Sequence, residues 1–213
     1  MADLSQAQPV AFNCEGGLVK NRSTFMMQEG EALELENFEP DVEGGYKRIK
    51  GFSKYVTAAV THTSSTSETI LMVASFADKV VAARGTSIFQ ATPGGSSWTS
   101  IDSGRTNAKK YNFERFNFDG NEKLIVADQT NAPTVFNSSF SATDVSESSV
   151  AGSKFVTAFK NHMFYAGNST SPQEVVFSQP FDEDAFSSGS GAGSIKVDDN
   201  ITGLKVFRDN LFI

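Results

Sequence analysis

The sequence has few of the residues that disulfides and metal sites require. It contains one cysteine, Cys14, and two histidines, His62 and His162. A single cysteine excludes an intrachain disulfide, so the chain is not a disulfide-stapled secreted domain, and Cys14 is interpreted as a small buried hydrophobic residue. Because neither HxxxH nor CxxC spacing is present, the sequence argues against a zinc site. Both histidines are expected in turns or loops, without a catalytic role.

Long hydrophobic runs are also missing. No stretch approaches the roughly 20 consecutive apolar residues that a membrane-spanning helix needs. The opening residues MADLSQAQPVAF lack the basic and apolar regions of a signal peptide. The sequence therefore predicts no membrane span.

Basic residues are outnumbered by acidic ones. The chain has 18 Lys and Arg against 25 Asp and Glu, a net charge of -7 and a pI near 4.9. Since binding to a nucleic-acid backbone depends on clustered Lys and Arg, this balance argues against a protein that wraps DNA or RNA. A negatively charged wall would still let DNA pass without binding it.

The residues that are abundant indicate a folded, all-β protein. The 213 residues are enough for one large domain or two small ones, and 39% hydrophobic against 20% charged residues argues against disorder. Nineteen Phe, together with many Ser, Thr, Asn and Gly, favour short strands joined by turns. No pattern predicts an amphipathic helix longer than two turns.

Short apolar runs that end at turn residues predict the strands. Alternation of Leu33 and Leu35 with Glu34 and Glu36 predicts a strand over Ala32–Phe38. The other predicted strands are Thr69–Ser75, Lys79–Arg84, Ser87–Thr92, Lys123–Asp128, Thr134–Asn137, Met163–Gly167, Glu174–Ser178 and Leu211–Ile213.

A repeated phrase suggests how these strands are organised. VTAFKNHMFYAG and ITGLKVFRDNLFI align with Phe159 on Phe207, 48 residues apart, and both give an aromatic residue, a base, an Asn or Asp turn and an apolar strand. FNFDGNEKLIVAD is a looser copy, and TILMVAS is interpreted as the copy before it. Periods of roughly 40 to 50 residues with several short strands are typical of propeller blades. A β-sandwich with chance similarity is the alternative.

The repeats also bear on the extent of the protein. Roughly four or more blades are needed to close a propeller ring, and the chain contains about three and the start of another. Ile213 falls inside an apolar strand. We expect these residues to be the N-terminal portion of a longer polypeptide, with residues 1–55 as an extended arm and corner and residues 56–213 as a partial propeller.

Motifs that could carry catalysis are weak. The acidic residues Asp182, Glu183 and Asp184 in FDEDAF, and Asp198 and Asp199 in VDDN, lack the spacing and glycine of a calcium loop, and are interpreted as solvated turn residues. The glycine run SSGSGAGS has no P-loop lysine and is interpreted as a flexible connection. The sequence therefore predicts no enzyme, metal or cofactor.

The segment NFEPDVEGGYKRIKGFSKY combines glycines, aromatics and bases, and it is interpreted as a structural corner. The nearby acids nearly cancel the charge of its bases, which argues against a nucleic-acid patch. Glycines are expected to adopt positive φ on either side of an aromatic, and Pro40 is expected to turn the chain out of the preceding strand. Tyr46 and Phe52 are expected to anchor the corner, and Arg48 is expected to bind carboxylates or carbonyls. The candidate residues are Asn37, Phe38, Pro40, Gly44, Gly45, Tyr46, Arg48, Gly51 and Phe52.

EGGL at residues 15–18, followed by NFEP at 37–40 and GGYKRIKGF at 44–52, resembles the opening of a family of virion proteins. These are the tail nozzle or tail tubular proteins, and the related head-to-tail, DNA-stabilisation proteins, of short-tailed bacteriophages. VVFSQPFDEDAF, SIKVDD and ITGLKVFRDNLFI also resemble blades of that family. Its members are much longer than this chain.

The resemblance implies a structural role in the virion tail. Copies made in the host cytoplasm would form a homo-oligomeric ring below the portal and adaptor, contact other tail proteins, and retain and then conduct double-stranded DNA without reading its sequence. The alternative of a different class is a carbohydrate-binding or glycan-cleaving propeller that acts as a host-receptor module. A bacterial scaffold or sensor propeller is a third possibility.

Overall fold

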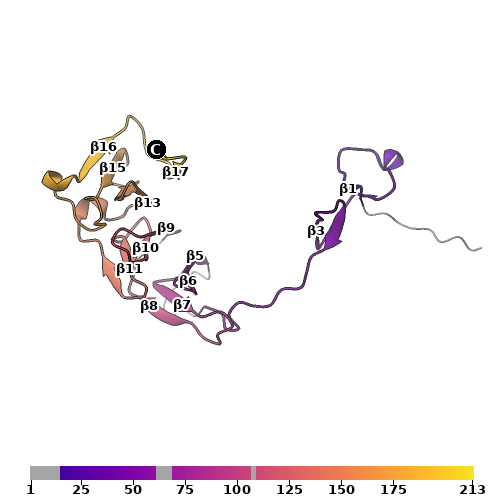
Figure 1. Cartoon of the computed structure of the whole chain (residues 1–213), viewed down its shortest axis with the longest axis horizontal. Coiled ribbons are helices and arrows are strands. Elements are labelled where there is room, and N and C mark those ends of the chain that lie inside the picture. The colour runs from indigo at the N-terminus through magenta and orange to yellow at the C-terminus, as the bar shows by residue number, and fades with distance from the viewer. Residues whose placement is uncertain (1–14, 61–68, 107–108) are drawn as a thin grey trace, which may run out of the picture. The chain divides into compact units, whose positions relative to one another are not determined.

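The chain forms two units, residues 1–53 and residues 54–213, and each is described by itself (Figure 1). The computed structural model describes residues 15–60, 69–106 and 109–213. Cys14 and His62 lie outside the described residues. The domain boundary predicted from the sequence was between residues 55 and 56, and unit 2 begins at Lys54.

Unit 2 contains three four-stranded antiparallel sheets, each a meander of consecutive strands (Figure 1). Sheet 1 consists of β5 (Ile70–Phe76), β6 (Lys79–Arg84), β7 (Ser87–Ala91) and β8 (Thr99–Asp102). Sheet 2 consists of β9 (Asn112–Phe116), β10 (Lys123–Ala127), β11 (Thr134–Phe136) and β12 (Ala142–Asp144). Sheet 3 consists of β13 (Phe155–Phe159), β14 (His162–Ala166), β15 (Glu174–Phe177) and β16 (Gly193–Lys196). A hairpin of β17 (Lys205–Phe207) and β18 (Asn210–Phe212) follows.

The sheets pack on one another in chain order, and strand β10 shows why its sequence is apolar throughout. Successive side chains of a strand point to opposite faces. Leu124 and Val126 lie in a core shared with sheet 1, whereas Ile125 and Ala127 lie in a core shared with sheet 3. All four are fully buried. A strand covered on both faces needs a continuous apolar run instead of alternation.

Strand β5 alternates because it is covered on one face. Met72, Ala74 and Phe76 are buried in the core between sheets 1 and 2, while Val73 is exposed. The segment before β5 covers another part of sheet 1: Val60 packs with Ala82 and Phe89, and the Trp98 indole donates to the carbonyl of Ala58 at 3.0 Å.

The first hairpins of sheets 1 and 3, and the hairpin β17–β18, turn in the same way. Each turn places two non-glycine residues in the left-handed region: Ala77 and Asp78, Lys160 and Asn161, and Arg208 and Asp209. In the last two, the base of the turn lies over the preceding phenylalanine ring, at 5.2 Å in both. The predicted correspondence between residues 159–165 and 207–213 is confirmed at these hairpins.

The earlier copy of the repeat was assigned to the wrong strand. TILMVAS forms β5, the first strand of its sheet, whereas KLIVAD and the strand after Asn161 are second strands. The structural counterpart of these two is β6. The error arose because Ala77 stands where the other two hairpins have a base, so this turn does not show the complete aromatic, base and Asn or Asp phrase.

Unit 1 contains two small strand pairs. β1 (Gly17–Leu18) pairs in parallel with β2 (Glu31–Ala32), and β3 (Phe38–Pro40) pairs antiparallel with β4 (Tyr46–Arg48). The strand predicted over Ala32–Phe38 is wrong, because the chain leaves β2 at Ala32 and Asn37 adopts a φ of 62° before β3. No residue between 15 and 53 is buried.

The predicted all-β class is confirmed. The helical segments among the described residues are three 3-10 turns of three residues each: η2 (Thr24–Met26), η3 (Ser148–Val150) and η4 (Ser188–Ser190). Nowhere in residues 15–60, 69–106 and 109–213 is there a helix long and apolar enough to cross a membrane. The sheets of the described chain do not close into a barrel or ring.

Candidate functional site

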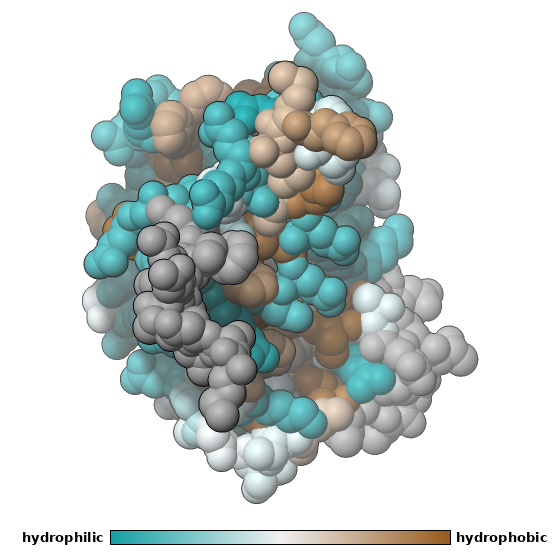
Figure 2. All heavy atoms as spheres, turned by 90° about the vertical axis from the view of Figure 1, so that its right-hand side faces the viewer, coloured by the Kyte–Doolittle hydropathy of each residue, from teal (hydrophilic) through white to brown (hydrophobic). Residues whose placement is uncertain are grey.

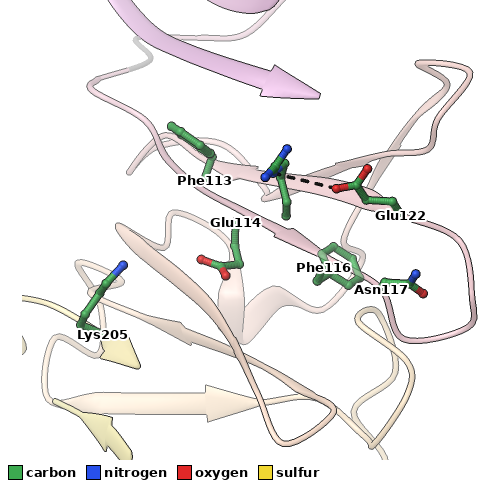
Figure 3. Close-up of a pocket in the computed structure, with 7 residues that line it drawn as sticks. Phe113, Glu114, Phe116, Asn117, Glu122 and Lys205 are labelled. Carbon is green, nitrogen blue, oxygen red and sulfur yellow. Dashed lines mark ion pairs between the residues drawn. The ribbon is translucent and has the colours of Figure 1, made fainter. Parts of the chain in front are cut away.

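An open cavity of about 760 Å³ lies along strand β9 of sheet 2 (Figure 3). β9 is an edge strand, since β10 is its one partner in the sheet. The residues that line the cavity are Phe113, Glu114, Arg115, Phe116, Asn117, Glu122 and Lys205. All but Lys205 belong to β9 or to the turn that follows it.

Alternation along β9 gives the cavity its mixed character. Phe113 and Arg115 are exposed, whereas Phe116 is buried in the core between sheets 2 and 3. The Arg115 guanidinium lies 3.9 Å from Glu122 across the hairpin. The cavity therefore offers an aromatic face beside charged hydrogen-bonding groups of both signs.

Glu114 is the cavity residue whose titration is most affected by its surroundings. Partial burial raises the pKa of its carboxyl above the ordinary value, and attraction to Lys205 and then Arg115 opposes this effect without cancelling it. In Figure 3 the Glu114 and Lys205 side chains point toward one another across the cavity. A half-buried carboxyl and a facing ammonium can hydrogen-bond a neutral polar ligand such as a sugar.

A buried polar network around Arg105 joins sheet 1 to sheet 2. Arg105 follows β8, and its guanidinium Nε donates to Asp102 at 2.6 Å while Nη1 donates to Asp128 at 2.9 Å. Its Nη2 donates to the Thr134 hydroxyl, which in turn donates to Asp144. The network thus holds the end of sheet 1 to strands β10, β11 and β12 of sheet 2.

Arg105 is 6% exposed, and Asp128 is completely buried. Burial alone would lower the pKa of Arg105, but the nearby Tyr111, Asp102 and Asp128 raise it above its ordinary value, so Arg105 stays charged. Asp128 also accepts from the backbone N–H groups of Thr130 and Asn131. A buried ion pair whose other hydrogen-bonding groups also have partners is expected to resist separation of the two sheets.

The acidic loop at residues 181–186 joins sheet 2 to sheet 3. Lys123 donates to Glu183 at 2.9 Å, the Tyr165 hydroxyl donates to the Glu183 carbonyl at 2.7 Å, and Asp184 accepts from the backbone N–H of Ser146 at 2.9 Å. The interpretation of Glu183 as a solvated turn acid is wrong, because Glu183 is buried. Burial would lower the pKa of Lys123, but Glu183 and Asp119 raise it.

The corner residues of unit 1 form a hairpin. Phe38 and Tyr46 face each other across β3 and β4 with ring centroids 5.6 Å apart, in an edge-to-face arrangement. Gly44 and Gly45, in the loop between these strands, have φ of 102° and 77°. Such values disfavour any side chain with a Cβ, so these two glycines fit the predicted turn.

Other features expected of the corner are not found. Pro40 does not end a preceding strand but is the last residue of β3, opposite Tyr46. Phe52 is 94% exposed and anchors nothing in the described chain. Gly51 does not adopt positive φ.

The ion pair expected of Arg48 is made by its neighbour. Lys47 donates to Asp41 at 3.2 Å, while Arg48 forms no ion pair with any described residue. Because successive side chains of β4 point to opposite faces, Lys47 and Arg48 cannot both reach the Asp41 side of the hairpin. Seven of the nine candidate residues, from Asn37 to Arg48, lie in or beside the β3–β4 hairpin, and Gly51 and Phe52 follow it. All nine belong to unit 1, whereas the cavity belongs to unit 2.

Sequence reasoning missed the β9 cavity and both buried networks. NFERF carries only a weak alternating pattern, and Arg105 lies in a short polar segment. His162, considered as a catalytic candidate and set aside, lies with Nδ1 2.6 Å from the Ser178 carbonyl oxygen, where it links β14 to the residue after β15.

No cluster of three or more metal-ligating side chains occurs within residues 15–60, 69–106 and 109–213. Comparison of the chain with protein-family models, curated proteins and solved structures gives no match. Function is therefore inferred from the residues and from their geometry.

Proposed function

We propose that the protein is a structural, non-enzymatic component of the tail of a short-tailed bacteriophage, of the nozzle or tail-tube kind. The observation that carries the proposal is the succession of four-stranded meanders held together by buried polar networks. Repeated sheets that are linked by buried ion pairs and hydrogen bonds would be rigid, which suits the wall of a tail channel that must resist internal pressure. The motifs at residues 15–18, 37–40 and 44–52 support the same family.

The sheets are proposed to be blades of a β-propeller. Each has four antiparallel strands in sequence order, which is the composition of a blade. The first strands of successive sheets approach one another: the backbone N–H of Val156 in β13 donates to the Asn112 side chain in β9 at 2.9 Å. Blades packed around an axis bring their first strands together in this way. The hairpin β17–β18 would begin the next blade.

In the virion, copies would form a homo-oligomeric ring beside the adaptor and portal. The net charge of -7 supports a role in which double-stranded DNA passes without adhering, because carboxylates repel phosphates. The protein would be made in the host cytoplasm and assembled into the tail.

Electron microscopy of virions labelled with an antibody against residues 1–213, together with images of the purified protein, tests this proposal. Label at the tail and rings with an axial channel are expected. Unlabelled virions and unassembled monomers would contradict the tail assignment.

A carbohydrate-binding module is a second candidate, favoured by the β9 cavity. An exposed aromatic ring beside a carboxyl, a guanidinium and an amide is a common composition for binding sugars, and Phe113, Glu114, Arg115 and Asn117 supply these groups. Binding to a glycan array that is lost in Phe113→Ala and retained in Phe207→Ala would establish this activity. Absence of binding by the unmodified chain would dismiss it.

A further inference from the structure

Unit 1 exposes large apolar side chains that have no core of their own. Phe25 and Val42 are each 98% exposed, and Met26 is 72% exposed. These values belong to residues 15–53, where no residue is buried. Figure 2 shows hydrophobic residues, in brown, beside hydrophilic ones at the surface of the chain. Large apolar side chains that are exposed in a segment without a buried core are typical of interaction surfaces.

The secondary structure of unit 1 is too small to explain its fold. Both of its sheets have two strands, and an isolated two-stranded pair is marginally stable in water. The strand pairs are supplemented by two ion pairs, Arg22 with Glu31 and Lys47 with Asp41, in which the basic side chains are exposed. Ion pairs at the surface contribute about 0 to 1 kcal/mol each. Unit 1 would therefore gain more stability by packing against another surface than it gains from its own strand pairs and ion pairs.

Charge indicates what that surface is. Residues 29–43 contain seven acids and no base. Glu31 and Asp41 are ion-paired as described above, while the other five form no ion pair with a described residue. The five are Glu29, Glu34, Glu36, Glu39 and Glu43. They alternate with apolar residues such as Leu33, Phe38 and Val42.

We propose that residues 25–43 are a docking segment for a different protein whose surface combines apolar pockets with Lys and Arg side chains. A second copy of this chain is a poor complement, because residues 54–213 carry 16 acidic and 13 basic residues. Nucleic acid is excluded as the occupant by the same negative charge. The inference is drawn from unit 1 alone and does not depend on the tail-assembly proposal.

The chain of residues 1–213 and a fluorescent synthetic peptide of alternating Leu and Lys provide the test. The peptide offers the proposed chemistry, and its binding is followed by fluorescence anisotropy. We expect binding that weakens by about tenfold or more between about 0.05 M and about 0.5 M NaCl, since exposed charges are screened over shorter distances at higher salt. A matched peptide of Leu and Glu is expected not to bind.

Two arm variants separate charge from apolar contact. Glu34→Lys, Glu36→Lys and Glu39→Lys together are expected to weaken binding by about tenfold or more, which corresponds to about 1.4 kcal/mol. Phe25→Ser with Val42→Ser leaves the charge unchanged and is expected to weaken binding severalfold. Circular dichroism should show that neither variant alters the fold, because the core lies in unit 2.

A charge-matched control places the same three reversals outside the arm. Asp182, Asp198 and Asp199 are exposed residues of unit 2, and their replacement by Lys is expected to leave binding within about twofold, a free-energy change of about 0.4 kcal/mol. Equal loss in this control would reveal general attraction to an acidic protein and overturn the proposal. Failure of the unmodified chain to bind would also overturn it. So would sedimentation showing a self-associated chain that the arm variants dissociate, because the occupant would then be a second copy.

Discussion

Units 1 and 2 use the same amino acids in opposite ways. In unit 2, Phe76 and Phe136 are almost completely buried among residues of adjacent sheets, whereas Phe25 and Phe52 of unit 1 are almost completely exposed. Unit 2 also buries charged groups, Arg105 and Asp128, whereas no charged residue between 15 and 53 belongs to the buried class. The difference teaches that unit 2 is stabilised by its own buried contacts, while residues 15–53 have no buried core of their own.

The comparison is tested most severely by Phe136→Ala. This side chain is fully buried in the core between sheets 1 and 2, so its loss leaves a cavity. We expect the free energy of unfolding to fall by about 3 to 5 kcal/mol, measured by urea denaturation. A fall below about 1 kcal/mol would mean that the sheets do not share a packed core.

Arg105→Ala removes the centre of the network between sheets 1 and 2. Asp128 would remain buried without its cationic partner, and we expect unfolding to become easier by about 3 to 5 kcal/mol. Arg115→Ala is the matched control, because Arg115 is exposed and lies 3.9 Å from Glu122. The control should change stability by less than about 0.5 kcal/mol. Similar losses of stability in the two variants would show that the Arg105 network does not stabilise unit 2.

Tyr165→Phe and Tyr111→Phe compare a buried hydroxyl that donates a hydrogen bond with a buried hydroxyl that has no partner among the described residues. The Tyr165 hydroxyl donates to the Glu183 carbonyl, which the variant would leave without this donor, so a loss of about 1 to 2 kcal/mol is expected in urea denaturation. The Tyr111 hydroxyl is buried without a hydrogen-bond partner among the described residues. Tyr111→Phe should therefore be neutral or stabilising, and a comparable loss there would contradict the assignment.

Glu114→Gln gives a smaller effect that depends on pH. Partial burial raises the pKa of Glu114 in the folded protein above its unfolded value, so ionisation destabilises the fold as pH rises through that interval and remains unfavourable above it. The variant should have a slightly higher Tm than the unmodified chain at pH 7, and the same Tm below the unfolded pKa of about 4.3. A variant that is less stable at pH 7 would show that attraction to Lys205 and Arg115 outweighs burial.

Phe52→Ala should have the smallest effect. The ring is 94% exposed, so its removal is expected to change the free energy of unfolding by less than about 0.5 kcal/mol. Paired with Phe136→Ala, it compares one substitution in the two units. A large loss would restore the anchor role predicted for Phe52 from the sequence.

Sequence patterns predicted the strands of unit 2 where apolar residues run together, as in Lys79–Arg84, which is β6. They missed β9 and β13, because two of the five residues of NFERF are charged and because FVTAF was interpreted only as the aromatic start of the repeat and not as a strand. The Arg105 network was not predictable, since it joins residues from 102 to 144 whose proximity depends on the packing of two sheets.

The corner shows a different limit. The positive φ of Gly44 and Gly45 was predictable from the sequence, because glycine adopts such backbone angles without steric cost. The strand over Ala32–Phe38 was predicted from alternation alone, and the positive φ at Asn37 interrupts it. The choice of Lys47 over Arg48 for the ion pair depends on strand orientation, which composition does not reveal.

The meander connections of unit 2 have a consequence for how the protein folds during its synthesis. Each sheet is completed within one uninterrupted stretch, residues 70–102, 112–144 and 155–196, so most of its pairings join near neighbours in the chain. Because each sheet is complete before the next begins, one sheet can assemble while the ribosome is still translating the following one. Arg105 emerges before Asp128, and Lys123 before Glu183. Arg105 already has Asp102 as a partner and Lys123 already has Asp119, so the emergence of Asp128 and Glu183 completes each ion-pair network and joins one sheet to the next.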